Sequence, residues 1–234
     1  RRMKIFIAQL NPIVGNLDSN AKKILKVLSK ASKEEANLVI TPELSLWGYP
    51  PKDLLYQKDL FIKQKKVLDE LSSAVASNYG NLSVTIGIAE EIEDCFFPNL
   101  YNSIALLENG TWKIIARKMI LPTYEVFDER RYFRAADKVS ILGKKINNKI
   151  WKIGITICED LWVNENIEGR GKHRKNPILD FEGENLDLLL NFAASPFTLK
   201  KAKVREKVSY FAAKQLKTPL IYINQIGGND DLVF

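Results

Sequence analysis

Three polar residues with complementary chemistry each follow a predicted buried strand. The residues and the strands that precede them are Glu43 after residues 37–41, Lys118 after residues 112–117, and Cys158 after residues 151–157. Open sheets place ligand chemistry at the carboxyl ends of their strands. We therefore expect the three side chains to meet in one pocket, where a thiol, an ammonium and a carboxylate can perform nucleophilic catalysis.

Each member of this trio has a definable chemical role. The ammonium of Lys118 would lower the pKa of the Cys158 thiol, and a helix that begins at Leu161 and Trp162 would add its N–H groups to that effect. Glu43 would accept the thiol proton, return it to a leaving amine, and then activate water against the thioester. Lys118 would also stabilise the oxyanion, and loss of one such donor costs about 3–4 kcal/mol of barrier.

The histidine and cysteine counts exclude other chemistries. The single histidine, His173, lies in a polar run that reads as a loop, and a catalytic base needs a rigid mount. Two cysteines, Cys95 and Cys158, are too few for a disulfide framework or, with one histidine, for a zinc cage. We therefore expect no metal site and a cytoplasmic protein.

Charge and hydropathy limit the partners. The formal net charge is +7, and part of the surplus lies in the basic run at residues 170–175. Nucleic-acid binding would also require interleaved aromatic residues or a known module, so a solvated basic face is favoured over a nucleic-acid-binding module. The chain contains no apolar run as long as the ~18–20 residues of a membrane span, and we expect no membrane partner.

Short strand patterns alternate with longer helical ones along a single continuous domain. Ser19 is the predicted cap of a helix that runs to about Ser32, and Asn109-Gly110 is a strong hairpin signal. The predicted strands are residues 4–10, 37–41, 82–89, 101–107, 112–117, 151–157, 186–192 and 219–223, with further helices around residues 60–71 and 200–216. Hairpins mixed with strand–helix alternation predict an α/β or α+β protein with two layers of sheet.

Several motifs, taken in order, resemble the carbon–nitrogen hydrolase (nitrilase) superfamily. They are Pro-Glu-Leu-Ser-Leu-Trp-Gly-Tyr-Pro-Pro-Lys-Asp-Leu-Leu at 42–55, Arg-Lys-Met-Ile-Leu-Pro-Thr-Tyr at 117–124, Phe-Asp-Glu-Arg-Arg-Tyr-Phe at 127–133 and Ile-Cys-Glu-Asp-Leu-Trp at 157–162. Within the superfamily, residues 48–55, 158–162, 191–197 and 224–234 resemble the glutaminase domains of glutamine-dependent NAD(+) synthetases.

The resemblance implies a four-layer α-β-β-α sandwich of the nitrilase type with Glu43, Lys118 and Cys158 as the catalytic triad. It also implies contacts to a glutamine substrate. These are Tyr124 lining the substrate site, Ser195 at the amino-acid end of the substrate, Lys201 facing its carboxylate, Glu159 holding its ammonium, and Glu129 orienting Lys118.

The activity implied by the resemblance is a glutamine amidohydrolase acting through a thioester and supplying ammonia for ATP-dependent amidation of nicotinic acid adenine dinucleotide to NAD. The glutaminase step would use no cofactor, and ATP and Mg²⁺ would belong to a synthetase domain that these 234 residues do not contain. We expect one domain over residues 3–234, preceded by two added arginines, as a truncated or processed part of a homo-oligomeric protein. A free-standing amidase or nitrilase with another substrate is the alternative.

Overall fold

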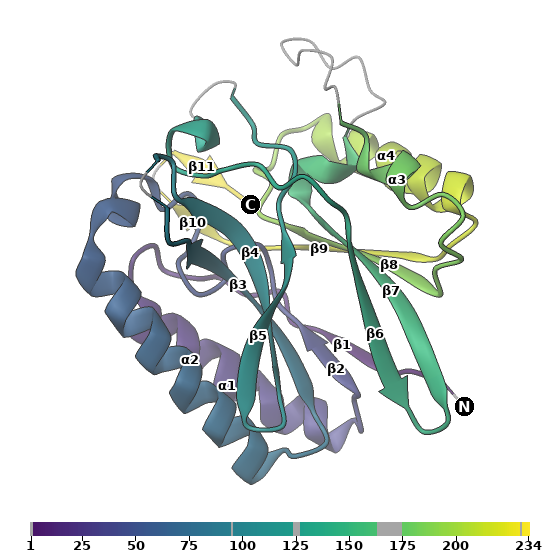
Figure 1. Cartoon of the computed structure of the whole chain (residues 1–234), viewed down its shortest axis with the longest axis horizontal. Coiled ribbons are helices and arrows are strands. Elements are labelled where there is room, and N and C mark those ends of the chain that lie inside the picture. Colours follow the sequence, from purple (N-terminus) through teal and green to yellow (C-terminus); the bar gives the residue numbers. More distant parts are fainter. Residues whose placement is uncertain (1, 95, 124–126, 163–174, 230) are drawn as a thin grey trace.

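Two β-sheets lie face to face, and each carries helices on its outer side (Figure 1). The computed structural model describes residues 2–94, 96–123, 127–162, 175–229 and 231–234. The first sheet has the strand order β1-β2-β3-β4-β5 and the second has the order β6-β7-β8-β9. The result is a four-layer α-β-β-α arrangement, which confirms the predicted fold class.

The first half of the chain builds the first sheet and its two covering helices. Its elements are β1 (Ile5–Ile7), α1 (Leu17–Lys33), β2 (Leu38–Ile40), η1 (Lys52–Tyr56), α2 (Lys58–Asn78), β3 (Ser83–Glu91), β4 (Leu100–Glu108) and β5 (Thr111–Arg117). Strands β1, β2 and β3 are parallel, and β3, β4 and β5 are antiparallel. The carboxyl end of β2 and that of β5 hold Glu43 and Lys118.

The second half of the chain builds the second sheet. Its elements are η2 (Glu129–Arg131), β6 (Ser140–Ile146), β7 (Lys149–Ile157), η3 (Cys158–Leu161), α3 (Pro177–Asp180), β8 (Leu188–Ala193), α4 (Lys201–Leu216), β9 (Leu220–Asn224), β10 (Gly228–Asn229) and β11 (Leu232–Val233). Strands β7, β8 and β9 are parallel, so their carboxyl ends meet at one edge.

Alternation along the strands produces three apolar layers. In β2, Val39 packs with α1 and α2, whereas Leu38 and Ile40 face the second sheet, because successive strand side chains point to opposite sides. Ile155 and Phe192 meet them from the second sheet, and Leu189 packs outward against α3 and α4. No helix within the described ranges is long and apolar enough to cross a membrane.

Most predicted elements are present, with shifted ends. Helix α1 begins at Leu17, and its cap is Asn16, whose side chain accepts a hydrogen bond from the Ser19 backbone N–H at 3.0 Å. The prediction of Ser19 as the cap was therefore wrong, because Asn caps a helix as well as Ser does and stands one turn earlier. Asn109 and Gly110 both have positive φ and form the predicted hairpin turn between β4 and β5.

The turn that carries Glu43 is pressed against β3. The Thr41 hydroxyl donates to the Thr85 carbonyl at 2.7 Å, and the Gly87 backbone N–H donates to the Ser45 hydroxyl at 3.0 Å. A Cβ at Gly87 would lie 2.2 Å from the backbone nitrogen of Leu44. Only a glycine therefore lets the turn approach β3 closely enough to seat Glu43.

Substitution Gly87→Ala should displace this turn and destabilise the protein by at least ~1–3 kcal/mol. The new Cβ would clash with backbone atoms of the turn, which cannot move aside as a flexible side chain could. Gly143→Ala is the matched control, since a Cβ there would meet only an ordinary contact with Ile150 at 3.5 Å. Urea denaturation of both variants measures the difference. Equal stability of the two would contradict the close packing of the turn.

Candidate active site

The ammonium of Lys118 lies between two carboxylates in the interior. Its Nζ atom donates to Glu43 Oε1 at 2.6 Å and to Glu129 Oε1 at 2.9 Å. The Lys118 and Glu43 side chains are fully buried, and that of Glu129 is 7% exposed. The Tyr49 hydroxyl donates to the same Glu129 oxygen at 2.6 Å. A buried charge needs partners of this kind, and this one has two.

Asn102 and Ala194 donate further hydrogen bonds to the Glu43 carboxylate. The Asn102 side chain donates to Glu43 Oε1 at 2.8 Å, and its backbone carbonyl accepts the Lys118 N–H at 2.8 Å. The Ala194 backbone N–H, just beyond β8, donates to Glu43 Oε2 at 3.0 Å. Glu43, from the first sheet, is thus anchored to the second sheet as well.

Cys158 lies at the same edge, at the end of β7. Ile157 pairs with Phe192 of the parallel neighbour β8, so Cys158 stands beside the residues that lead to Ala194. Cys158 has a φ of 44°, in the left-handed region, and begins the short helix η3. Strained backbone conformations of non-glycine residues are common at functional sites. In this protein the conformation of Cys158 makes the chain turn sharply at the end of β7.

Burial and charge shift the pKa values within this group. Burial lowers the pKa of Lys118, but the charges of Glu129 and Glu43 outweigh burial and hold it well above its ordinary value. Burial raises the pKa of Glu129, Lys118 opposes the rise, and the charge of Glu43 adds to it. One ammonium therefore balances only one of the two carboxylates.

The Cys158 thiol responds to the excess of negative charge. Burial raises its pKa well above the ordinary value, Glu43 raises it further, and Lys118 opposes both without cancelling them. Lys118 thus acts on the thiol pKa in the expected direction, but burial and Glu43 outweigh it, so the overall shift is upward. The expected contribution of a helix beginning at Leu161 and Trp162 was misplaced, because η3 begins at Cys158 and ends at Leu161.

Known proteins resemble this chain along most of its length. The family model for carbon-nitrogen hydrolases matches residues 4–168. The chain belongs to the carbon–nitrogen hydrolase family. This assignment confirms the superfamily that the sequence motifs indicated, and the two-sheet core described above is the framework of a carbon–nitrogen hydrolase.

Individual relatives and structures agree with this assignment. A glutamine-dependent NAD(+) synthetase from Synechocystis sp. is 40% identical over 98% of this chain. Another from Thermotoga maritima is 34% identical over 100% of this chain. The structure of glutamine-dependent NAD+ synthetase from Acinetobacter baumannii matches with a TM-score of 0.83 at 32% identity over 99% of this chain. This chain spans only 40%, 37% and 40% of these three proteins, respectively.

An amidase of the nitrilase superfamily shares the fold. The amidase from Nesterenkonia sp. AN1 superposes with a TM-score of 0.74 at 17% identity, covering 100% of this chain and 82% of the amidase. At that identity the likeness concerns the fold alone.

The residues predicted to contact the substrate of this carbon–nitrogen hydrolase lie in different places. Glu159 is buried directly after Cys158, and Ser195 is buried directly after Ala194. Lys201 lies further along, as the half-buried first residue of α4. Tyr124, like Cys95 and His173, lies outside the described residues, as does the basic run except for Lys175.

Sequence reasoning missed several residues that hold the site together. Arg205, one turn into α4, donates to the carbonyl oxygens of Ser195 and Pro196 at 2.7 and 2.9 Å. Asp160 accepts backbone N–H groups from both sheets, and Asn102 and Tyr49 hold the two carboxylates. The sequence shows an acid at Asp160, two residues after the predicted nucleophile, but it does not show which groups that acid binds.

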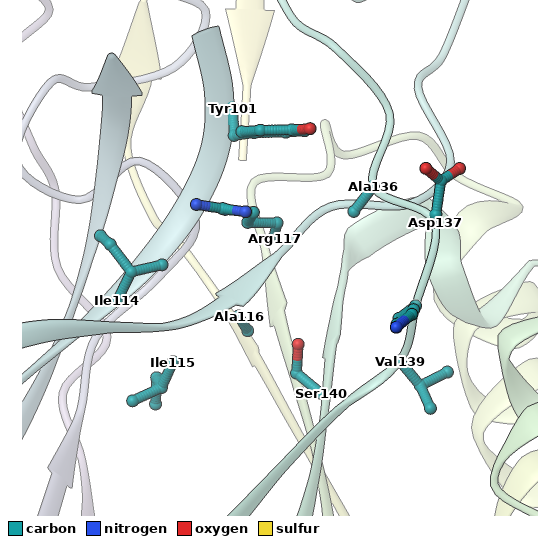
Figure 2. A pocket seen from close by; sticks show the side chains of 10 residues that line it. Tyr101, Ile114, Ile115, Ala116, Arg117, Ala136, Asp137, Val139 and Ser140 are labelled. Atoms are coloured by element: carbon teal, nitrogen blue, oxygen red, sulfur yellow. The ribbon is translucent and has the colours of Figure 1, made fainter. Parts of the chain in front are cut away.

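A separate hollow of about 470 Å³ lies between the edge strands β5 and β6 (Figure 2). Arg117 points into it beneath the ring of Tyr101, whereas the next residue, Lys118, is buried in the candidate site. Arg117 forms an ion pair with Glu90, and Asp137 forms one with Lys175. Cys158 remains the candidate site, because Arg117 and Asp137 in this hollow already have partners.

Alkylation of Cys158 tests the electrostatic arrangement without any substrate. We expect Glu43→Gln to lower the thiol pKa and to speed alkylation by iodoacetamide at neutral pH, because the substitution removes a charge that opposes the thiolate. Lys118→Met should slow alkylation. Glu90→Gln is the control, since Glu90 pairs with Arg117 away from the thiol. Site-resolved mass spectrometry measures the rates, and slower labelling of Glu43→Gln would contradict the assignment.

Asp160 should make stability depend on pH. Burial raises its pKa from 3.8 to about 7, against hydrogen bonds from the backbone N–H groups of Ile157 and Ile120. The native state therefore keeps a proton that the unfolded chain releases above pH ~4, so stability falls as pH rises towards 7, by up to roughly 4 kcal/mol.

Denaturation of the wild type and of Asp160→Asn at pH 5 and pH 8 measures this slope, which should be smaller in the variant. Asp187→Asn is the control. The pKa of Asp187 is lowered, chiefly by its bond to Lys149, so its titration lies below this window. An equal slope in wild type and Asp160→Asn would show that Asp160 does not titrate there.

Proposed function

We propose that this chain is a glutamine amidohydrolase with Cys158 as nucleophile, Glu43 as general base and Lys118 as oxyanion stabiliser. The observation that carries the proposal is the buried Glu43–Lys118–Glu129 group at the strand ends beside Cys158. The names of the relatives, glutamine-dependent NAD(+) synthetases, support glutamine as the source of the amide.

The proposed reaction proceeds in two halves. Cys158 Sγ attacks the carboxamide carbon while its proton passes to Glu43, and the oxyanion forms next to the Lys118 ammonium. Glu43 returns the proton to the nitrogen, the C–N bond breaks, and ammonia leaves a thioester. Water then attacks the thioester with Glu43 as base, which releases glutamate and restores the thiol.

The high thiol pKa fits concerted activation of this kind. A cysteine that rests as a thiol needs a base in contact at the moment of attack. Glu43, whose charge acts on the thiol, would serve as that base. Glu129 would keep Lys118 oriented. Its second oxygen is buried and forms no hydrogen bond within the described part of the chain, so it can accept an N–H from a carboxamide.

We assign the zwitterionic end of glutamine to the remaining residues. Glu159, buried beside Cys158, would bind the α-ammonium, and Lys201 at the start of α4 would face the α-carboxylate. Ser195 would bind the same end, and Tyr124 would line the site. No cofactor enters this step, and among the described residues no group of three or more His, Cys, Asp or Glu is arranged to hold a metal ion.

We also propose the setting of the reaction. The ammonia would serve a synthetase domain that uses ATP and Mg²⁺ to amidate nicotinic acid adenine dinucleotide, as the names and greater lengths of the relatives suggest. The domain would occupy residues 3–234 and assemble with further copies of itself in the cytoplasm.

Ammonia release from L-glutamine tests the proposal directly. Cys158→Ala should abolish release, and Glu43→Gln should lower kcat by ~10²–10⁴-fold, because proton transfer then lacks its base. Glu43→Gln should at the same time alkylate faster than wild type, which separates loss of the base from loss of the thiol. Glutamine should protect Cys158 from alkylation.

Propionamide provides the substrate control. Hydrolysis of propionamide as fast as L-glutamine would assign the chain to the simple amidases instead. Equal activity of Cys158→Ala and wild type would remove the proposed nucleophile.

A further inference from the structure

The Asp160 carboxylate joins the two catalytic strand ends. Its Oδ1 atom accepts the backbone N–H groups of Met119 at 3.1 Å and Ile120 at 2.9 Å, and its Oδ2 atom accepts the Ile157 N–H at 3.0 Å. The first two donors directly follow Lys118, and the third directly precedes Cys158. Asp160 itself is 2% exposed.

These bonds cross between the two sheets. Lys118 follows β5 of the first sheet and Cys158 follows β7 of the second (Figure 1). The apolar layer between the sheets is non-directional, so it holds them together without specifying how their ends align. Hydrogen bonds to a carboxylate are directional and strong, and three of them fix the alignment at this point.

Only the ionised carboxylate, which predominates above the Asp160 pKa of about 7, can receive all three donors. An ionised carboxylate accepts hydrogen bonds at both oxygens and donates none, whereas an amide of the same shape presents an N–H₂ group on one side. Asparagine at this position would turn that group towards either Ile157 or the pair that follows Lys118. The amide N–H₂ group would then face a backbone N–H group, and no hydrogen bond could form between these two donors.

We propose that Asp160 is a positioning residue that sets the distance between the Lys118 ammonium and the Cys158 sulfur, an inference that rests on the function proposed above. Asp160 does not need to contact substrate. The hydrogen bonds of Asp160 hold the backbone that follows Lys118 and the backbone that precedes Cys158. Loss of the Asp160 carboxylate therefore separates the oxyanion stabiliser from the nucleophile. A misplacement of ~1 Å in such a pair lowers the rate by about 100-fold.

The experiment compares Asp160→Asn with Asp187→Asn. Asp187 also accepts a backbone N–H from β7, that of Lys152 at 2.8 Å, and binds Lys149, but at the opposite end of the strand. Both variants lose one carboxylate that bonds to β7, so a general loss of stability affects both. At pH 8, where Asp160 is mostly ionised, we expect kcat for L-glutamine to fall about 100-fold in Asp160→Asn only, with KM within about threefold of wild type.

Alkylation of Cys158 provides a readout that needs no substrate. Iodoacetamide should label Asp160→Asn more slowly than wild type and Asp187→Asn, because Lys118 is the group that lowers the thiol pKa. Each rate is measured well below the unfolding midpoint of that variant and normalised to its folded fraction. A variant that does not fold is replaced by Asp160→Ser, which removes the same bridge with a smaller side chain.

The outcomes separate this inference from the proposed function. A wild type that releases no ammonia from any amide, with slower alkylation in Asp160→Asn alone, refutes the proposed function and supports the positioning role. Unchanged kcat and alkylation in folded Asp160→Asn overturn the inference. Equal losses in Asp160→Asn and Asp187→Asn also overturn it, because they indicate a general effect on stability.

Discussion

The buried ammonium of Lys118, held between the carboxylates of Glu43 and Glu129, is the interaction on which the rest of this site depends. Removing these three charges from water costs several kcal/mol per ion, and only mutual contact and further hydrogen bonds repay that cost. The fold supplies those bonds from Asn102 and Tyr49. An apolar group of equal size would give a core at least as stable, so the ion group is better explained by chemistry than by stability.

The charge of this group affects the protonation of the Cys158 thiol. Burial favours a protonated Cys158, and the negative pocket left by two carboxylates around one ammonium adds to that preference. A protonated thiol is a poor nucleophile until a base removes its proton. In the proposed mechanism, the carboxylate that disfavours the thiolate at rest, Glu43, also accepts that proton, so activation would be confined to the moment of attack.

Much of the fold and the central trio follow from the sequence, because bounded apolar runs identify strands and polar residues just after them identify the catalytic edge. Other features depend on tertiary contacts that carry no local signal. Asp160 acts on backbone N–H groups about 40 residues away, which no side-chain pattern reveals. Strand β6 was missed because its exposed edge carries Lys144 and Lys145 instead of a clear apolar alternation. The sign of the thiol pKa shift required knowing how deeply Cys158 is buried.

The bond from the Ala194 N–H to Glu43 joins residues 151 positions apart in the chain. Closing so long a loop costs entropy that local contacts cannot repay in advance, and parallel strand pairs add to the delay. Each sheet with its helices can gather much of its own apolar surface earlier. The pocket around Glu43 must therefore be among the last parts of the molecule to form. In a newly made chain, the proposed activity would begin only after the two halves have docked.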